Sequence, residues 1–133
     1  MELVLMGRGY RDLVCWEKSM AFAEAIYRLT ERFDRFDTFG LISQLQRSSI
    51  SVASNIAEGA GRSHRKDFLK HLSYARGSLA EAETQLELCV RTKRLSRQEV
   101  LPAWQLAQET GRLLTSLMQS LSSDFTRSST TKD

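Results

Sequence analysis

Apolar residues recur at alternating spacings of three and four along most of this chain, which is the period of one face of an α-helix. In the first third of the chain the pattern predicts a helix over residues 12–33. Its seam holds Leu13, Trp16, Met20, Ala23, Tyr27 and Thr30. Ile26 and Phe33 lie beside this seam, and Cys15, Phe22 and Leu29 lie one step further round the helix. This apolar arc is wider than packing inside one small bundle usually needs. The surplus can contact the other helices or a second subunit, and we favour the second subunit.

The second predicted helix covers residues 39–60 and follows a polar connection at residues 34–40. Thr38 is a candidate N-cap, because its hydroxyl can accept a hydrogen bond from the first turn. The seam of this helix consists of Leu41, Leu45, Ser48, Val52, Asn55 and Gly59. We expect the helix to end in a left-handed cap at Gly59 and Gly61, since glycine adopts that conformation without steric cost.

The third predicted helix covers residues 64–91, with Ser63 as a candidate cap. It has the most regular seam of the chain: Phe68, Leu72, Ala75, Leu79, Ala82, Leu86 and Cys89. These positions follow a seven-residue repeat without interruption, so this helix is the best-supported element of the sequence.

The fourth predicted helix follows Ser96 and Glu99, whose spacing of three is the signature of a capping box. Its seam consists of Val100, Trp104, Ala107, Gly111, Leu114, Met118 and Leu121. Pro102 has no backbone N–H, so the helix is expected to kink there or to begin near Leu101.

Four helices of about 20 residues joined by short connections favour antiparallel neighbours. The expected fold is therefore all-α, an antiparallel up-down-up-down four-helix bundle over residues 10–121. Residues 1–9 form an N-terminal extension. Residues 122–133 have few apolar side chains to bury and are expected to be disordered.

The chain has 133 residues, enough for one domain that buries about two thirds of the surface of its unfolded form. It needs no disulfide or metal to hold a core, so we expect Cys15 and Cys89 to be reduced thiols in a cytosol. No apolar stretch reaches about 18 residues, and the first residues lack the pattern of a secretion signal. We therefore expect a cytoplasmic protein without a membrane span. The formal net charge of +3 permits an acidic partner without requiring one.

Candidate catalytic residues are few. His64 and His71 share one face of the third helix with Asp67 between them, but a structural metal normally takes four ligands, so we favour a solvated first turn. The spacing of Arg65 and His71 resembles the Arg-x4-6-His motif of HEPN-type ribonucleases, a remote alternative because arginine is common here. No Ser/His/Asp triad, phosphate-binding loop or carboxylate pair is present. The sequence therefore predicts no enzyme, no cofactor and no metal.

Basic residues gather at the two ends of the expected bundle. At the end formed by the turn between the third and fourth helices they are Arg28, Arg32, Arg91, Lys93, Arg94 and Arg97. At the opposite end they are Arg62, Arg65 and Lys66. Such side chains can neutralise phosphates and bind RNA or DNA in a salt-sensitive way. The alternative for one isolated subunit is an ordinary solvated surface, whereas a symmetric oligomer would repeat the clusters and favour binding.

The stretch SVASNIAEGAGR in the second helix is poor in large apolar side chains. Asn55 falls on the seam of the helix, and Ser51 and Glu58 flank it. An Asn in a helical seam is best known for fixing register or oligomer state, and Glu58 can pair with Arg62 four residues later. A small residue such as Gly59 lets a neighbouring helix approach closely. We favour this structural role over a ligand site.

The same residues carry a family resemblance. The matching stretches are YRDLVCWEKS (10–19), FGLISQLQRSSISVASNIAEGAGR (39–62) and FLKHLSYARGSLAEAETQLELC (68–89). Their most specific parts are the Ser-x-x-x-Asn-Ile-Ala-Glu-Gly core and the Gly-Ser-Leu-x-Glu run. In this order they resemble the four-helix bundle proteins encoded in bacterial 23S rRNA intervening sequences. That superfamily includes the accessory variability protein of diversity-generating retroelements, and the match covers about residues 10–121.

The resemblance implies a bundle that assembles as a homopentamer with a basic surface or channel. In the retroelement relatives the barrel binds nucleic acid and a reverse transcriptase, so a reverse transcriptase is an implied partner if this chain is retroelement-associated. The family supplies no catalytic residues. We therefore predict a non-enzymatic homo-oligomer, a pentamer, that binds RNA or DNA. A protein-binding adaptor without nucleic-acid binding is the alternative.

Overall fold

The computed structural model describes the backbone of residues 9–33 and 40–131, and the side chains of this part except those of residue 12 and residues 124–131. All regular structure in these ranges is helical. A short 3₁₀ turn, η1 (Gly9–Asp12), precedes α2 (Val14–Thr30), α3 (Leu41–Ala60), α4 (Arg65–Arg91) and α5 (Arg97–Thr131).

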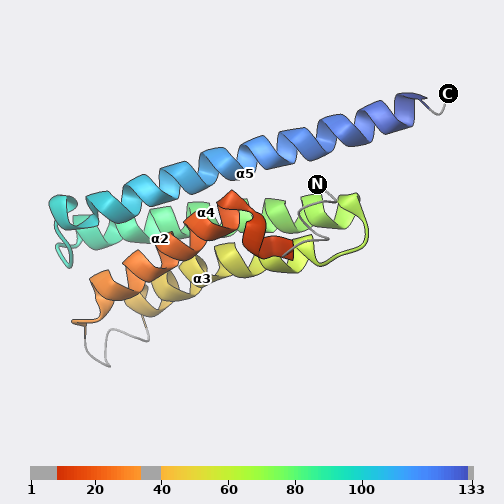
Figure 1. Cartoon of the computed structure of the whole chain (residues 1–133). Helices are drawn as coiled ribbons and strands as arrows, with labels where there is room; N and C mark the ends of the chain where they lie inside the picture. The colour runs from red at the N-terminus through yellow and green to blue at the C-terminus, as the bar shows by residue number, and fades with distance from the viewer. Residues whose placement is uncertain (1–8, 34–39, 132–133) are drawn as a thin grey trace.

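The four long helices run alternately up and down, so each is antiparallel to the next (Figure 1). Each packs mainly against two neighbours in the cyclic order α2, α3, α4, α5, and the pair of α3 and α4 has the most extensive contact. The connections at 61–64 and 92–96 are too short for anything but a reversal of the chain. The predicted all-α antiparallel four-helix bundle is confirmed.

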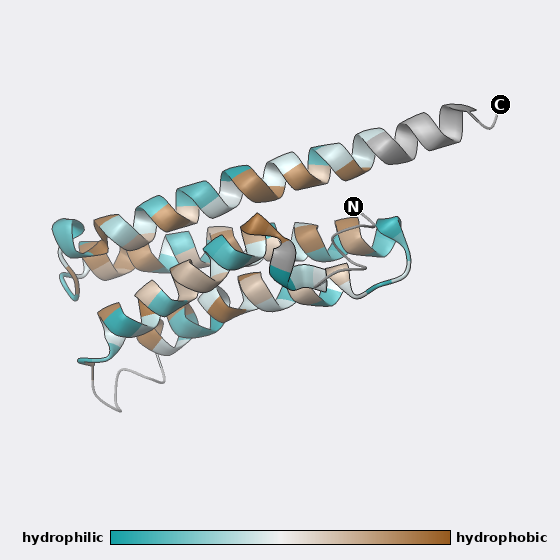
Figure 2. Ribbon diagram, viewed as in Figure 1, coloured by the Kyte–Doolittle hydropathy of each residue, from teal (hydrophilic) through white to brown (hydrophobic). Residues whose placement is uncertain are grey.

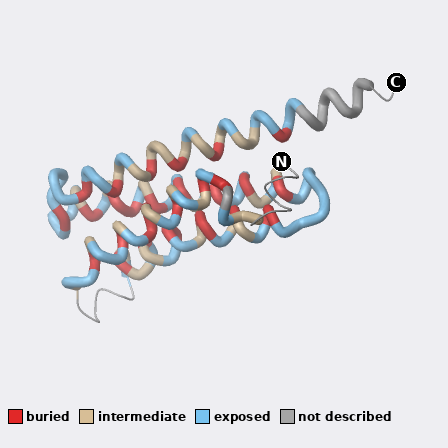
Figure 3. Tube along the Cα trace, viewed as in Figure 1, coloured by how far each residue is buried: buried red, intermediate tan, exposed pale blue. Residues whose placement is uncertain are grey.

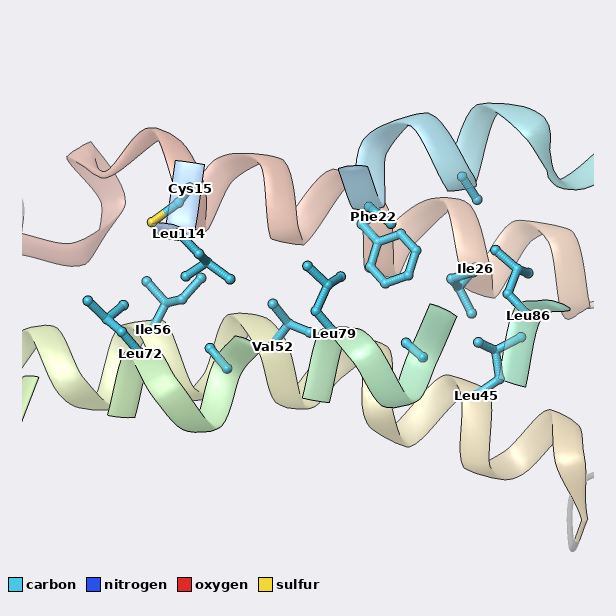
Figure 4. Close-up of a cluster of buried hydrophobic side chains, with 14 of the residues drawn as sticks. Cys15, Phe22, Ile26, Leu45, Val52, Ile56, Leu72, Leu79, Leu86 and Leu114 are labelled. Carbon is cyan, nitrogen blue, oxygen red and sulfur yellow. The ribbon is translucent and has the colours of Figure 1, made fainter. Parts of the chain in front are cut away.

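The core lies between the facing sides of the helices, where buried segments recur along each one (Figure 3). The hydrophobic segments recur along the helices in the same periodic way (Figure 2). All seven residues of the seam predicted for α4 are buried. Figure 4 shows Leu72, Leu79 and Leu86 of this seam facing apolar side chains of α3. Each fully buried leucine contributes about 1.5–3 kcal/mol, so the regular repeat of α4 supplies much of the bundle's stability.

The seam predicted for α2 is partly wrong. Met20 and Tyr27 are each 42% exposed, whereas Phe22 and Ile26 are fully buried. The helix presents Cys15, Phe22 and Ile26 to the core together with Leu13, Ala23 and Thr30 of the predicted row. Where an apolar arc is wider than one seam, two rows fit the same helical period, and the positions of the neighbouring helices decide which row is buried.

The end of α3 differs from the predicted left-handed cap. Gly61 has φ −83° and ψ −5°, in the right-handed region, and its N–H donates to the carbonyls three and four residues earlier (both 3.2 Å). A left-handed residue occurs at the end of α4 instead, where Lys93 has φ 64°. There the N–H groups of Lys93 and Arg94 donate to carbonyls of the last turn (3.0 and 2.9 Å). The left-handed residue that ends a helix therefore lies after α4, in the connection to α5, and not after α3.

The capping box of α5 is confirmed. Ser96 Oγ accepts the N–H of Glu99 at 3.0 Å, and Glu99 Oε2 accepts the N–H of Ser96 at 3.2 Å. The helix therefore begins at Arg97, and Pro102 lies inside it rather than at its start. The missing N–H of Pro102 leaves the carbonyl of Gln98 without its helical donor, at an exposed position where water can replace it.

Neither of the other two predicted caps stands at the N-cap position of its helix. Thr38 lies outside the described residues, and the residue that precedes the first turn of α3 is Gly40. At α4 the N-cap is His64 rather than Ser63, and no side chain caps this helix. The first N–H groups of α4 therefore lack a side-chain partner among the described residues.

Helix α5 continues to Thr131, through most of the segment 122–133 that the sequence analysis expects to be disordered. No glycine or proline follows Gly111 in the sequence, so no residue there breaks a helix that has already formed. Although α5 is long, neither it nor any other described helix is both long and apolar enough to cross a membrane.

Candidate nucleic-acid interface

The cations predicted to bind nucleic acid are exposed and lie at the two ends of the bundle (Figure 1). The α4–α5 end comprises the last turn of α2 and the connection between α4 and α5. It carries Arg28, Arg32, Arg91, Lys93, Arg94 and Arg97. The α3–α4 end comprises the connection between α3 and α4 and the first turns of α4. It carries Arg62, Arg65 and Lys66.

At the α4–α5 end, Arg32 binds the carboxylate of Glu99 through both of its terminal nitrogens, at 3.1 and 3.0 Å. One of them also donates to the carbonyl of Arg94 at 3.1 Å. Because Glu99 caps α5 as well, this one carboxylate links the end of α2 to the start of α5. The hydrogen bonds from Arg32 and from the Ser96 N–H lower the pKa of Glu99, and Glu99 raises the pKa of Arg32.

Glu87, near the end of α4, binds two further arginines at this end. Arg97 donates to both of its carboxylate oxygens (2.9 Å each), and Arg91 Nε donates to Oε2 at 3.0 Å. These hydrogen bonds, that of Arg97 first, lower the pKa of Glu87 from 4.5 to about 2. Arg28 pairs with Glu24 at 2.6 Å. Four of the six predicted cations here are thus already bound to carboxylates.

The Glu87 cluster makes the stability of the bundle pH-dependent in a defined window. The pKa of this carboxyl is lower in the folded chain than its ordinary 4.5, so the unfolded chain takes up the proton first as the pH falls. Its contribution is complete above about pH 4.5 and is lost as the pH falls toward about 2. In denaturant unfolding across this range, Glu87→Gln should therefore lose stability less steeply than the wild type. If the free energy of unfolding changed equally steeply with pH in the two chains, the account would be contradicted.

The α3–α4 end is different, because most of its cations have no carboxylate partner. Arg62 pairs with Glu58 at 2.9 Å. Arg65 and Lys66, and Lys70 one turn later, are exposed and form no ion pair with a residue that the structure describes. Arg65 and Lys66 are the first two residues of α4, whose first turn no side chain caps and whose first N–H groups carry the positive end of the helix dipole. Asp67 in that turn reduces the field without pairing with these cations.

The sequence analysis did not predict the four ion pairs at the α4–α5 end. Two of them could have been recognised from sequence spacing and two could not. Glu24 and Arg28, like Glu87 and Arg91, are four residues apart on one helix, a spacing at which such side chains pair. The bonds of Arg97 to Glu87 and of Arg32 to Glu99 join different elements. Only the packing of the helices brings those groups together.

The residues of the SVASNIAEGAGR stretch make contacts within and between helices. Asn55 Nδ2 donates to the carbonyl and the hydroxyl oxygen of Ser51, at 2.9 and 3.1 Å, and Ser51 Oγ lies 2.9 Å from Ser78 Oγ on α4. At Gly59 an added Cβ would lie 2.7 Å from the Cβ of His71. The stretch therefore holds α3 against α4, and its contacts are those of a packing motif.

A further hydrogen bond between these helices was not anticipated from the sequence. Ser48 Oγ donates to Gln85 Oε1 at 2.6 Å, and both side chains are buried. The signal was a serine on the predicted seam of α3, because a buried hydroxyl requires a partner. Its partner on α4 could not be identified without the register of the two helices.

A family model described as 23S rRNA-intervening sequence protein matches residues 11–116 of this chain, which is most of the bundle. The chain belongs to this family. The expected family resemblance is therefore confirmed. A crystal structure of a protein of unknown function from the S23 ribosomal protein family of Bacteroides thetaiotaomicron is similar, with a TM-score of 0.73 and 29% identity. The similarity covers 80% of this chain and 96% of that one. No curated protein matches the chain.

The candidate catalytic residues of this 23S rRNA-intervening sequence protein, Arg65 and His71, both lie on α4. His71 is half-buried against Tyr74, with ring centroids 5.7 Å apart, and its Nδ1 is buried without a hydrogen-bond partner. Arg65 and His71 form no hydrogen bond within the described residues. The described residues also contain no group of three or more His, Cys, Asp or Glu side chains that could hold a metal.

Both cysteines of this family member are buried and free. Burial raises the pKa of the Cys15 thiol to about 11, and it also raises the pKa of the Cys89 thiol. A protonated, buried thiol is a poor nucleophile. These two residues therefore serve the core.

Proposed function

We propose that this 23S rRNA-intervening sequence protein is a non-enzymatic homo-oligomer that binds the phosphates of RNA or DNA through its α3–α4 end. The observation that carries the proposal is the contrast between the two ends. Arg65, Lys66 and Lys70 are exposed beside an uncapped helix start and have no carboxylate partner among the described residues. At the α4–α5 end, most arginines are held by Glu24, Glu87 or Glu99.

The contrast matters because a phosphate must compete with any carboxylate that a cation already binds. An arginine held by two hydrogen bonds, such as Arg97, loses them before it can bind a phosphate oxygen. Arg65 and Lys66 exchange only water and counterions, and the release of counterions from the nucleic acid favours binding. The first N–H groups of α4 add donors of the kind that bind phosphates at helix starts.

Two further observations support the proposal. The name of the family refers to 23S rRNA, which makes RNA the first nucleic acid to test. The phosphate backbone is common to RNA and DNA, so contacts of this kind distinguish poorly between them. A cytoplasmic protein with these contacts would encounter RNA of many sequences.

The proposal predicts unequal effects from two charge-neutralising double variants. Arg65→Gln with Lys66→Gln should weaken RNA binding about tenfold and make its salt dependence less steep, because two phosphate contacts are lost. Arg28→Gln with Arg91→Gln removes the same charge from cations that are already paired. We expect this matched control to keep most of the affinity. Fluorescence anisotropy with a labelled single-stranded RNA at several salt concentrations measures both.

The opposite ranking of the two double variants would place the contact at the α4–α5 end. Equal and small effects of both would leave only general attraction by the net charge of the chain. Binding to no RNA or DNA at low salt would remove this function and leave the protein-binding adaptor. Cleavage of the labelled RNA that His71→Ala abolishes would contradict the assignment as a non-enzyme.

A further inference from the structure

An exposed aromatic ring lies beside the unpaired cations of the α3–α4 end. Tyr74 of α4 is 49% exposed and follows Lys66 and Lys70 at successive spacings of four residues. Side chains four residues apart are neighbours on a helix surface, so the three form one row. Consecutive members are separated by about 6 Å along the helix axis. Two cations and a ring therefore follow one another along the outer side of α4.

The ring of Tyr74 is supported from the bundle side by His71. The two ring centroids are 5.7 Å apart and the ring planes are at 90°, the edge-to-face arrangement that aromatic pairs favour. His71 is itself packed against α3, because its Cβ lies only 2.7 Å from where a Cβ on Gly59 would be. The close contact of α3 and α4 therefore positions His71, and His71 positions one side of the Tyr74 ring. The rest of the ring is open to solvent.

The charge beside the ring is positive on balance. Residues 65–70 contain three cations and one acid, Asp67. On α3, Glu58 is already bound by Arg62 at 2.9 Å. Glu81 follows Tyr74 by seven residues, which places it about 10 Å further along α4. A phosphate beside Lys66 or Lys70 would therefore meet a net positive surface on the side from which it approaches the ring.

A row of this composition suits an unpaired strand better than a duplex. Lysines bind the phosphates, and an exposed aromatic ring stacks on a base whose face is uncovered. In a duplex the faces of the bases are covered by their neighbours, and only loops, bulges and single strands offer them to a side chain. Every base has such a face, so this contact selects for unpaired RNA without selecting a sequence.

We propose that Tyr74 stacks on one unpaired base, so that the α3–α4 end binds single-stranded RNA in preference to double-stranded RNA. This inference rests on the proposed function, because it uses the phosphate contacts of the same end, and it specifies the form of RNA that they take. Lys66 and Lys70 bind phosphates on one side of the stacked base. The edge-to-face contact with His71 holds the ring in place before the RNA arrives.

The wild-type chain gives the first test. A fluorescently labelled oligo-uridine is titrated alone and after annealing to oligo-adenosine, and anisotropy measures the affinity at one salt concentration. Contacts with phosphates alone favour the duplex, because its charge density is higher. Stacking reverses this order, and we expect the single strand to bind about tenfold more tightly. A duplex that binds as tightly as the single strand, or more tightly, would overturn the inference and leave the phosphate contacts in place.

Substitutions of Tyr74 give the second test. Tyr74→Ala should weaken binding of the single strand about tenfold without changing the salt dependence, because stacking releases no counterions. It should leave the affinity for the duplex unchanged. Tyr74→Leu keeps apolar bulk but has no ring, so it should behave like Tyr74→Ala. Tyr74→Phe keeps the ring and should restore binding. Tyr74 is exposed, so these variants keep the fold, which circular dichroism and light scattering verify.

The outcomes separate this inference from the proposed function. If Tyr74→Ala bound the single strand like the wild type while Arg65→Gln with Lys66→Gln still weakened binding, stacking would be excluded and the phosphate contacts would remain. Wild-type affinity in Tyr74→Leu would indicate an apolar contact instead of stacking and would overturn the inference. An equal loss for single strand and duplex in Tyr74→Ala would also overturn it. Binding to neither form of RNA would refute the proposed function together with the inference.

Discussion

Replacing Phe22 with Ala should lower the free energy of unfolding by about 3–5 kcal/mol. The side chain is fully buried in the core, where it lies beside Ile26 and faces α3 and α4 (Figure 4). Its removal takes away the buried apolar area and leaves a cavity that the rigid helices fill only in part. The loss is a large fraction of the 5–15 kcal/mol that stabilises a typical domain. Urea unfolding followed by circular dichroism measures it.

Met20→Ala is the matched control on the same helix. Met20 belongs to the row that the sequence pattern favoured as the seam, yet it is 42% exposed. Its truncation should cost less than about 1 kcal/mol, the usual range for a partly exposed side chain. Both variants are compared at low protein concentration, because association adds stability that depends on concentration. A larger loss for Met20→Ala than for Phe22→Ala would mean that α2 turns its other face to the core.

Gly59→Ala should lower the free energy of unfolding by about 1–2 kcal/mol, although alanine is the better helix former by about 1 kcal/mol. The added Cβ would meet the Cβ of His71 at 2.7 Å and Cδ1 of Phe68 at 3.0 Å. The Cβ of His71 is attached to the backbone and cannot rotate away, so α3 and α4 must move apart. That separation also disturbs the hydrogen bond of Ser51 with Ser78 along the same interface.

Gly77→Ala on α4 is the control for this substitution. Nothing lies within 4 Å of an added Cβ at Gly77, and this glycine is exposed within the helix. The same chemical change should therefore raise the free energy of unfolding by up to about 1 kcal/mol. Thermal or denaturant unfolding of the two variants should give changes of opposite sign. If both variants were more stable than the wild type, the close contact of α3 and α4 at Gly59 would be contradicted.

The sequence predicts the bundle well because three of its long helices each have one dominant apolar row. In α4 the seven predicted seam residues are all buried, since a narrow stripe has only one way to face a core. In α2 the arc is wider, and the sequence could not decide between two rows that differ by one step. The helix caps differ in the same way. The reciprocal pair Ser96 and Glu99 is close in sequence and was predicted. The left-handed conformation of Lys93 was not, because lysine has no preference for it.

The candidate interface could be predicted only as a set of positions. Sequence order and antiparallel helices placed the cations at two ends, and the structure has them there. Whether each cation forms an ion pair depends on carboxylates of other helices, as Arg32 does with Glu99 of α5. Whether a cation is bound to a carboxylate of its own chain is a property of helix register, which a single sequence does not contain.

The most direct test of the central claim is the salt dependence of RNA affinity for the wild-type chain. Binding through phosphates releases counterions, so the logarithm of the association constant should fall linearly with the logarithm of salt concentration. Each contact with single-stranded RNA contributes about −0.7 to the slope. With Arg65, Lys66 and Lys70 as contacts, we expect a slope of about −2 for one subunit and a steeper one for an oligomer. A slope near zero, or no binding at low salt, would contradict the account.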